Sequence, residues 1–252
     1  MGLPVMGIEW LTRRPIAHRG LHNAANGIIE NTGPAFEAAI AGDYGIECDV
    51  QISADGEAMV HHDDALGRLT DGHDRLADLT TAELQAVRFR TGGARILTLG
   101  ELCDLVAGRV ALTVEIKSRF DGDTRIAKRT AHVLNGYKGP AAAMSFDPAQ
   151  VVAFARAVPG LPRGIVAERH YDHAEWSTLS PSQRYSLAWF THAAVTRPHF
   201  IAYAVRDLPA LVPFVARNLL GRPLLTWTVR TAADREQAAR YADQMIFEGF
   251  RP

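Results

Sequence analysis

Short runs of hydrophobic or alternating residues recur along the chain, with segments of helical periodicity between them. The runs are 15–19, 45–51, 59–62, 111–117, 141–146, 163–167, 200–203, 224–229 and 244–248. Alternation of this kind is typical of a parallel sheet. The runs exceed by one the eight strands of a closed barrel, but Asp55-Gly56 indicates a hairpin that would fold 59–62 back beside 45–51. We therefore predict an α/β fold, a (β/α)8 TIM barrel with a small insertion after the second strand.

Several predicted helices have recognisable starts. In each, a residue whose side chain can accept a hydrogen bond from the first turn precedes a helical segment, and two starts have the form of a capping box. The segment 168–197 is longer than a simple connection and contains one of these helices, but its function cannot be assigned from the sequence. The predicted caps are Asn31 or Thr32, Thr80, Thr98, Asp147, Ser180 and Thr231.

The composition is that of an ordinary soluble globular protein. With 252 residues and no linker, repeat or low-complexity tract, a single domain spanning 1–252 is expected, with a small cap segment at about 63–97. The formal net charge is −1, so bulk charge predicts neither nucleic acid nor an anionic membrane as a partner. Attraction for an anionic substrate must therefore be local.

The chain lacks the features of a secreted or membrane-spanning protein. No run of about 18 apolar residues is present to cross a bilayer, and the chain start has no long apolar stretch after its basic residues. The two cysteines, Cys48 and Cys103, are interpreted as free thiols. A cytoplasmic location is expected, and the oligomeric state is left open.

Two carboxylates follow the polar face of the second predicted strand. Because side chains alternate across a strand, Ile46, Cys48 and Val50 share one face and would pack under helices. Glu47 and Asp49 share the other face and would point into the barrel. Two inward acids one strand step apart repel each other unless a cation lies between them.

The run 111–117 repeats this arrangement, with Thr113, Glu115 and Lys117 on its polar face. One such strand is equally well explained as a salt-bridged polar face. Two otherwise apolar strands with charges near their C-terminal ends favour a site, since barrel enzymes build their sites there and unpaired buried charges are costly. Oxygen ligands suit Mg²⁺ or Ca²⁺, and no zinc-binding motif is present.

Two of the ten histidines differ from the rest by their position. His18 ends the first predicted strand, and His62 ends the predicted hairpin strand beside Asp63. Imidazole titrates near neutral pH, so two such groups can act as base and acid in one reaction. The adjacent His61 would project to the opposite face of its strand.

The order of these residues resembles the glycerophosphodiester phosphodiesterases, within the wider group of phosphatidylinositol-phospholipase-C-like barrels. The similarity runs from about residue 15 to the end of the chain and is densest up to Lys117. One departure is Phe247-Glu248-Gly249, where the family often has Thr-Asp. The matching motifs are His18-Arg19-Gly20, Glu30-Asn31, Glu47-Cys48-Asp49-Val50, Asp55-Gly56, His62-Asp63, Glu115-Ile116-Lys117 and Trp227-Thr228-Val229.

The resemblance implies hydrolysis of a small glycerophosphodiester to glycerol 3-phosphate and an alcohol, with one divalent cation, Mg²⁺ or Ca²⁺, as cofactor. The nucleophile would be water or the neighbouring glycerol hydroxyl, and either histidine could act first. Arg68 matches a family position that we interpret as structural. The implied roles are metal binding for Glu47, Asp49 and Glu115, acid–base catalysis for His18 and His62, phosphate binding for Arg19 and Lys117, and a substrate-pocket wall for Trp227.

Two alternatives use the same residues. A lysophospholipase D-type enzyme would act on lysophospholipids, but the few apolar residues of the cap segment look like helix core, which favours water-soluble diesters. A non-catalytic barrel that binds a phosphorylated ligand would be expected to lack a catalytic residue, whereas both histidines and all three acids are present here. The identity of the leaving alcohol stays open.

Overall fold

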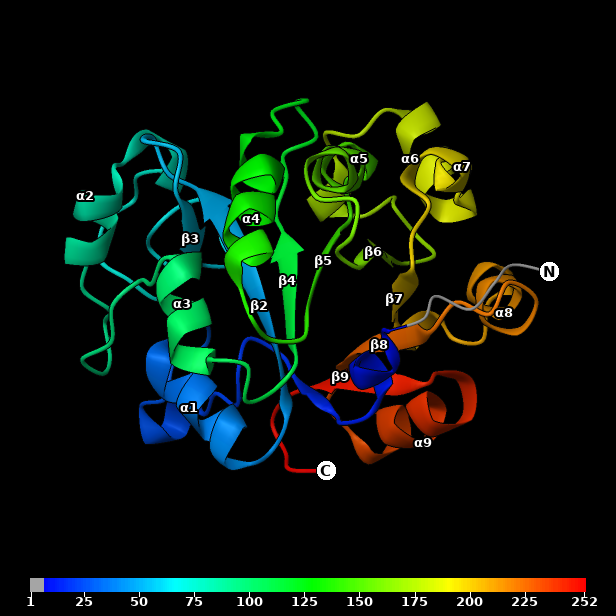
Figure 1. Ribbon diagram of the computed structural model, residues 1–252, viewed down its shortest axis with the longest axis horizontal. Helices are drawn as coiled ribbons and strands as arrows, with labels where there is room; N and C mark the ends of the chain where they lie inside the picture. Colours follow the sequence, from blue (N-terminus) through cyan, green and yellow to red (C-terminus); the bar gives the residue numbers. More distant parts are fainter. Residues whose placement is uncertain (1–6) are drawn as a thin grey trace.

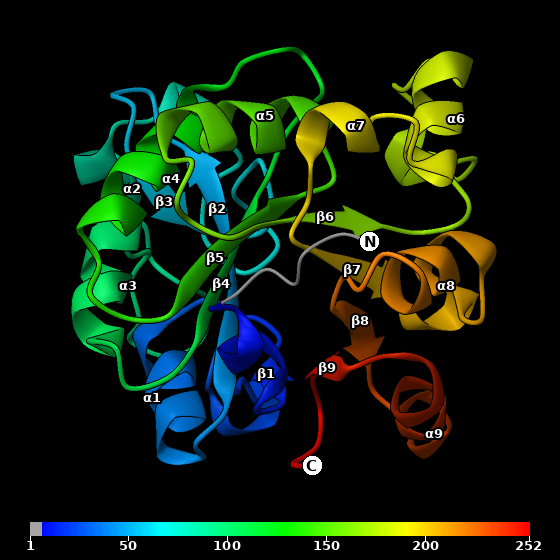
Figure 2. The ribbon, with the colours of Figure 1, turned by 45° about the vertical axis from the view of Figure 1, so that its right-hand side comes forward.

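Eight parallel strands close into a barrel, which confirms the predicted fold (Figures 1 and 2). The structure is a computed structural model that describes residues 7–252. The strands follow the order β1-β9-β8-β7-β6-β5-β4-β2, and pairing of β1 with β2 closes the ring. Their bounds are β1 Ile16–Ala17, β2 Gly45–Ile52, β4 Leu112–Ile116, β5 Ala141–Ser145, β6 Arg163–Ala167, β7 Phe200–Ala204, β8 Leu224–Val229 and β9 Gln244–Phe247.

The ninth strand forms the predicted hairpin. Strand β3 (Ala58–Val60) pairs antiparallel with β2, with Val50 opposite Val60. Gly56 occupies the turn with a φ of 86°, in the left-handed region that glycine adopts without strain. The run 59–62 is therefore not one of the barrel strands.

Helices surround the barrel, as Figure 1 shows. Thr80 and Thr98 form the two predicted capping boxes, and the predicted caps at Asp147, Ser180 and Thr231 also bond to their first turns. The helices are α1 Gly33–Ala41, α2 Thr81–Ala86, α3 Leu99–Val106, α4 Arg125–Gly136, α5 Pro148–Ala157, α6 Pro181–Trp189, α7 Ala193–Thr196, α8 Leu211–Asn218 and α9 Ala232–Tyr241.

The predicted cap of α1 is confirmed in position but not in its hydrogen bond. Thr32 occupies the N-cap position, but its side chain makes no capping hydrogen bond and donates instead to the carbonyl of Ile29, at 2.6 Å. Asn31 lies one residue earlier, and its side chain bonds to Asp49. A local hydrogen bond to Ile29 therefore uses the Thr32 side chain, and a tertiary contact to Asp49 uses that of Asn31.

Two hydrophobic layers fix the strands in place. Ile46, Cys48 and Val50 lie in the outer layer, between the strands and helices, as the alternation predicted. The inner layer fills the barrel near the strand starts, where the Phe200 ring approaches Gly164 so closely that a Cβ there would lie 2.4 Å from it. Because this end is packed with side chains, only the opposite end can hold a site.

The remaining sequence expectations concern the periphery. The apolar residues of the cap segment 63–97 pack against one another as a small core, as expected. Cys48 and Cys103 are buried and free. Within residues 7–252, no helix has the length and hydrophobicity needed to cross a bilayer. The expectation about the chain start falls partly on residues 1–6, outside the described residues. The cytoplasmic location and the single-domain bounds stay predictions.

Candidate active site

Three carboxylates meet where β2 and β4 run side by side. The register pairs Glu47 with Thr113 and Asp49 with Glu115, so the acids of both strands face the barrel interior at neighbouring levels. Glu47 and Asp49 are each 1% exposed and Glu115 is 8% exposed. One ligand atom from each lies within 4.8 Å of the others. The structure thus brings together the three acids that the alternation placed inside the barrel.

The charges of these acids are strongly coupled. Burial, reinforced by the charges of Asp49 and Glu115, raises the pKa of Glu47 well above its usual value. Burial would also raise the pKa of Asp49, but the cations of Lys117 and Arg19 hold that pKa well below its usual value. The Lys117 Nζ atom lies 2.8 Å from Asp49 Oδ1 and 2.6 Å from Glu115 Oε1. The nearby cations therefore compensate Asp49, whereas a negative charge on Glu47 is not compensated by them.

The donor set fits a hard divalent cation. Glu47 Oε2 accepts a hydrogen bond from the Arg19 amide at 2.9 Å, but the buried Oε1 atom has no hydrogen-bond partner within residues 7–252. An uncompensated carboxylate oxygen in a buried site is costly, and a cation between the three acids would compensate it. Carboxylate oxygens suit Mg²⁺ or Ca²⁺. Glu47, Asp49 and Glu115 are the residues that would hold such an ion.

Arg19 leaves the first strand in a tight turn. The strand ends at Ala17, earlier than the predicted 15–19, because Arg19 and Gly20 adopt left-handed φ values of 56° and 78°. A Cβ at Gly20 would lie 2.8 Å from the Ala35 carbonyl carbon, so only glycine fits. This turn directs the guanidinium toward Asp49, at 3.2 Å from Oδ2.

A second set of polar residues holds Arg19 and Asp49 in position. Asn31 donates to Asp49 Oδ2 at 2.8 Å and accepts from the Asp49 amide at 3.2 Å. Glu30 accepts from Arg19 at 2.7 Å and from Arg68 at 2.6 Å. The Glu30-Asn31 motif is thereby explained as support for the site. Arg68, which also bonds Asp63 at 2.6 Å, has the structural role inferred for it.

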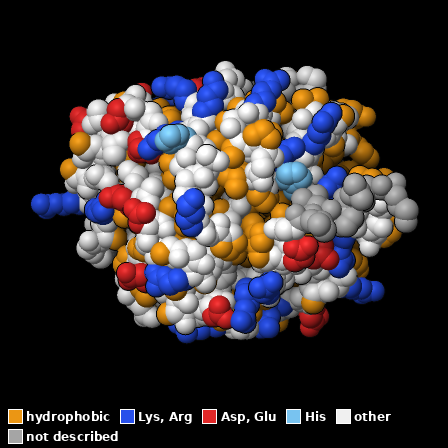
Figure 3. Space-filling view, viewed as in Figure 1, with side chains coloured by type: hydrophobic (Ala, Val, Ile, Leu, Met, Phe, Trp, Pro, Cys, Tyr) orange, Lys and Arg blue, Asp and Glu red, His pale blue; other side chains and the backbone are white. Residues whose placement is uncertain are grey.

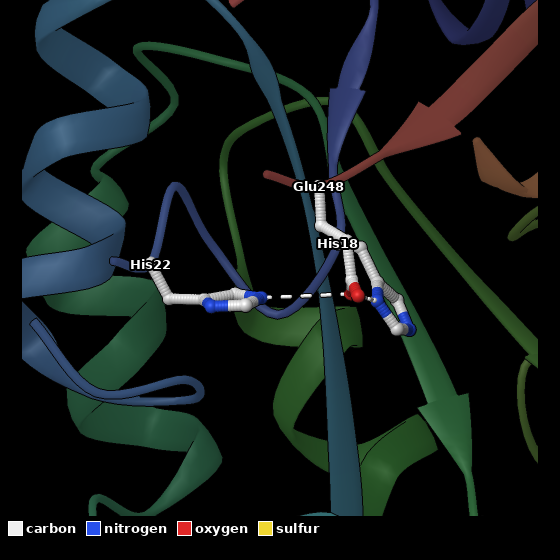
Figure 4. Close-up of side chains that lie close together, drawn as sticks. All are labelled: His18, His22 and Glu248. Carbon is white, nitrogen blue, oxygen red and sulfur yellow. Dashed lines mark hydrogen bonds and ion pairs between the residues drawn. The ribbon is translucent and has the colours of Figure 1, made fainter. Parts of the chain in front are cut away.

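His18 lies beside a carboxylate from the last strand. Its Nδ1 atom hydrogen-bonds Glu248 Oε2 (Figure 4). Arg230 donates to the other oxygen of Glu248 at 2.6 Å. His22 approaches from the far side, with Nε2 at 3.6 Å from Glu248 Oε2. Burial would raise the pKa of Glu248, but the hydrogen bond from His18 and the nearby side chains of His22 and Arg230 hold it well below its usual value. Burial lowers the pKa of His18, and Glu248 opposes that shift.

His62 has a matching carboxylate partner. Its Nδ1 atom lies 2.8 Å from Asp63 Oδ1, and its backbone carbonyl accepts from Gln51 at 2.8 Å. Both histidines thus have Nδ1 engaged by an acid, which leaves Nε2 as the nitrogen available to a ligand. His61 is buried and bonds the Asp63 carbonyl through Nδ1, in agreement with the prediction that it projects to the other face.

One cavity of about 580 Å³ unites these groups at the C-terminal ends of the strands. The predicted site residues line it, except Asp49, which lies beneath Arg19 and Lys117. Trp227 forms part of the opposite wall, where its ring packs edge-on against Phe146 with centroids 5.5 Å apart. The cavity therefore has a charged side and an aromatic side.

The segment 168–197 contributes part of that aromatic side. Trp176 packs on Phe146, with ring centroids 4.9 Å apart. The buried Glu168, directly after β6, accepts hydrogen bonds from Trp176, from His173 at 2.6 Å and from Arg206. Glu168 fixes the entrance in this way. Sequence analysis missed this residue and Glu248, although both directly follow strands at the end where barrel sites form.

The sequence of this chain is similar to those of known phosphodiesterases. The sequence model of the glycerophosphoryl diester phosphodiesterase family matches residues 18–250. The "Probable glycerophosphodiester phosphodiesterase 1" of Mycobacterium tuberculosis is 30% identical over 241 residues, which cover 85% of this chain and 81% of the relative. A glycerophosphodiester phosphodiesterase of Caldanaerobacter subterraneus is 38% identical over 111 residues, and that alignment covers only 41% of this chain and 44% of the relative.

Solved structures share the fold. A phosphodiesterase from Oleispira antarctica, solved in complex with the product sn-glycerol-3-phosphate, superposes with a TM-score of 0.73 at 20% identity and covers 92% of this chain and 91% of its own. A glycerophosphodiester phosphodiesterase from Thermotoga maritima gives a TM-score of 0.69 at 22% identity, over 93% and 94% of the two chains.

Proposed function

Because the chain belongs to the glycerophosphoryl diester phosphodiesterase family and is a phosphoric diester hydrolase, we propose that it cleaves glycerophosphodiesters to glycerol 3-phosphate and an alcohol. His18 and His62 are the acid–base pair, and Glu47, Asp49 and Glu115 hold one divalent cation. The observation that carries these roles is the convergence of three buried acids and two histidine–carboxylate pairs on one cavity.

The charged side of the cavity suits a phosphodiester anion. A divalent cation held by the three acids would offset the phosphate charge and the additional charge of the transition state. Arg19 and Lys117 add two fixed cations that border the cavity. We assign them to the phosphate oxygens, since a ligand at this position lies within reach of both.

The two histidines transfer the protons. Each has Nδ1 bonded to a carboxylate, which fixes the ring orientation and directs Nε2 to the substrate. One imidazole accepts the proton of the nucleophile, and the other protonates the leaving alcohol. Each transfer typically contributes about 10²–10⁴ in rate. His18→Ala and His62→Ala should therefore abolish turnover while the fold is retained, as circular dichroism would show.

Water-soluble diesters are the preferred substrate class. The large apolar side chains of the cap segment pack inward as a core, so they offer no acyl-chain pocket over the site. Trp227 and Trp176 line the cavity as flat walls for the organic part of the substrate. A lysophospholipid-cleaving enzyme would need an apolar channel that this cap does not form.

Product analysis tests the proposal. Several glycerophosphodiesters and one lysophospholipid would be incubated with enzyme stripped by chelation, with and without added Mg²⁺ or Ca²⁺. We expect glycerol 3-phosphate and free alcohol only in the presence of metal, and faster turnover of the soluble diesters. Full activity of the stripped enzyme would exclude the carboxylate metal site, whereas saturable binding without product would identify a binding barrel. A cyclic phosphate in quenched samples would identify the glycerol hydroxyl as nucleophile.

A further inference from the structure

The exposed hydrophobic side chains are concentrated on one flank of the barrel. Within residues 7–252, all seven large hydrophobic side chains that are mostly exposed lie between residues 185 and 220, on or directly after α6, α7 and α8. Figures 1 and 2 place these three helices on the same side. Trp189 is 55% exposed, Leu211 65% and Phe214 56%. Such a concentration on a soluble protein marks an interaction surface.

Two adjoining grooves run through this flank. One holds about 380 Å³ and the other about 460 Å³, and both are lined by Trp189, Leu211 and Val212. The first begins at Arg169, next to the C-terminal end of β6, and the second ends at Arg222, before β8. The apolar surface thus extends along the barrel from the entrance of the active site toward the opposite end.

The charges along these grooves have one sign. Arg169, Arg197 and Arg222 line them, and no aspartate or glutamate of the described chain does. Arg163 lies close by, and its pKa is lowered by burial and by the positive charges of Arg197 and Arg222. Within residues 7–252, the side chains of Arg169, Arg197 and Arg222 form no ion pair, although Asp207 accepts a hydrogen bond from the Arg169 amide at 2.8 Å. Figure 3 shows arginine or lysine side chains interspersed with hydrophobic ones over the part of the molecule where α6 and α7 lie.

We propose that this flank binds the surface of a bilayer that contains anionic phospholipids. Exposed tryptophan and tyrosine side chains favour the boundary between acyl chains and headgroups, and Trp189 lies beside Tyr185 with the rings tilted and their centroids 6.4 Å apart. Leu211 and Phe214 would enter the acyl boundary, while the arginines contact lipid phosphates. The formal net charge is −1, so the attraction comes from this patch and not from the whole protein.

A second copy of the chain fits this surface less well. A two-fold interface brings the same patch of both subunits together. Here that contact would bring Arg197 and Arg222 of both subunits into one interface whose grooves contain no acid to pair with them. Like charges brought into a desolvated interface oppose association. The charge pattern therefore favours an anionic surface.

Vesicle sedimentation tests the proposal with the full chain and is independent of catalysis. We expect the protein to sediment with phosphatidylcholine vesicles that contain about one third phosphatidylglycerol, to bind pure phosphatidylcholine far more weakly, and to be released by high salt. Each arginine at the surface contributes about fivefold to the partition coefficient, so Arg197→Gln/Arg222→Gln should lower it roughly 25-fold. Trp189→Ser/Leu211→Ser should lower binding even at low salt.

Matched controls separate the patch from general charge. Arg88 and Arg90 are exposed in the cap segment, away from α6–α8, and form no ion pair within residues 7–252. Arg88→Gln/Arg90→Gln should bind like the wild type, and thermal unfolding should show all variants folded. Equal losses in the two arginine pairs would overturn the proposal, as would failure of the wild type to sediment with either vesicle. A wild-type dimer that Trp189→Ser/Leu211→Ser converts to monomer in light scattering would show a self-association surface instead.

Discussion

Glu248→Gln is the substitution that most directly tests how the site controls His18. Glutamine is close to glutamate in size but carries no charge, so it keeps a polar contact to His18 and Arg230 and removes the anion. Glu248 is the carboxylate bonded to His18 Nδ1, and that bond leaves Nε2 for the substrate. The glutamine amide can accept a hydrogen bond through its oxygen or donate one through its NH2 group. It can therefore bond His18 with the proton on Nε2 as readily as His18 with the proton on Nδ1.

The expected loss follows from this bond. A hydrogen bond to a charged group contributes about 1.5–3 kcal/mol. If this bond stabilises only the form of His18 that reacts, with the correct ring orientation and tautomer, its loss lowers the rate roughly 10- to 150-fold. Because Glu248 does not line the substrate cavity, kcat should fall while KM changes little. Glu248→Asp keeps the charge one methylene further back and should recover part of the loss.

The pH profile gives a second readout that a merely structural role would not change. Burial lowers the pKa of His18, and the bond and charge of Glu248 raise it. Removing that charge leaves only Asp49 to oppose burial and the Arg19 cation, so the pKa of His18 falls further. The limb of kcat/KM against pH that reports His18 should therefore move to lower pH in Glu248→Gln.

Arg230→Gln is the matched control. Arg230 donates to the other oxygen of Glu248 at 2.6 Å, but its side chain is 56% exposed, and exposed ion pairs contribute about 0–1 kcal/mol. Because Arg230 itself lines the cavity, kcat is the quantity to compare, and it should stay within about fivefold of the wild type. A Glu248→Gln enzyme with an unchanged rate and pH profile, measured with initial rates on a soluble diester, would refute the positioning role.

Three further predictions concern metal binding and stability. Asp49→Asn should remove both activity and the rise in melting temperature that Mg²⁺ or Ca²⁺ produces in the wild type, measured by thermal shift. Burial raises the pKa of Glu30, but Arg68 and Arg19 lower it to about 2. The charged Glu30 therefore contributes up to about 3 kcal/mol to the free energy of unfolding above pH about 4.5, and this contribution is lost as the pH falls toward 2. Glu30→Gln should accordingly make the free energy of unfolding, measured with urea, depend less on pH between these values. Gly20→Ala should lower the free energy of unfolding, measured with urea, by about 2–5 kcal/mol. Gly27→Ala is the control, because Gly27 has a similar φ but open space where a Cβ would lie, and it should cost only about 1–2 kcal/mol. Equal losses in the two variants would exclude the steric argument for Gly20.

The sequence alone determined those features that depend on neighbouring residues. Alternation in 45–51 and 111–117 placed Glu47, Asp49 and Glu115 inside the barrel because a strand sends successive side chains to opposite faces. Asp55-Gly56 predicted the hairpin because its turn requires left-handed backbone. These rules act over a few residues, so they can be read before the fold is known.

Barrel closure decided the partners of these residues. Glu248 meets His18 because β1 pairs with β9 across the ring, 230 positions along the chain. Glu168 likewise reaches Arg206 only when β6 lies beside β7. Neither contact can be predicted from the neighbouring sequence, since nothing there distinguishes these two residues from other acids that follow a strand.

The apolar flank of α6–α8 also combines features that local sequence predicts with features that only the assembled fold decides. Hydrophobic periodicity indicates that helices have an apolar side, but burial depends on which surfaces other elements cover. Only the assembled barrel leaves Trp189 and Leu211 uncovered and places arginines around them. The sequence therefore determined the local geometry of strands and turns, and the tertiary structure decided which distant side chains meet, because the hydrophobic packing that brings them together is non-directional and depends on the whole chain.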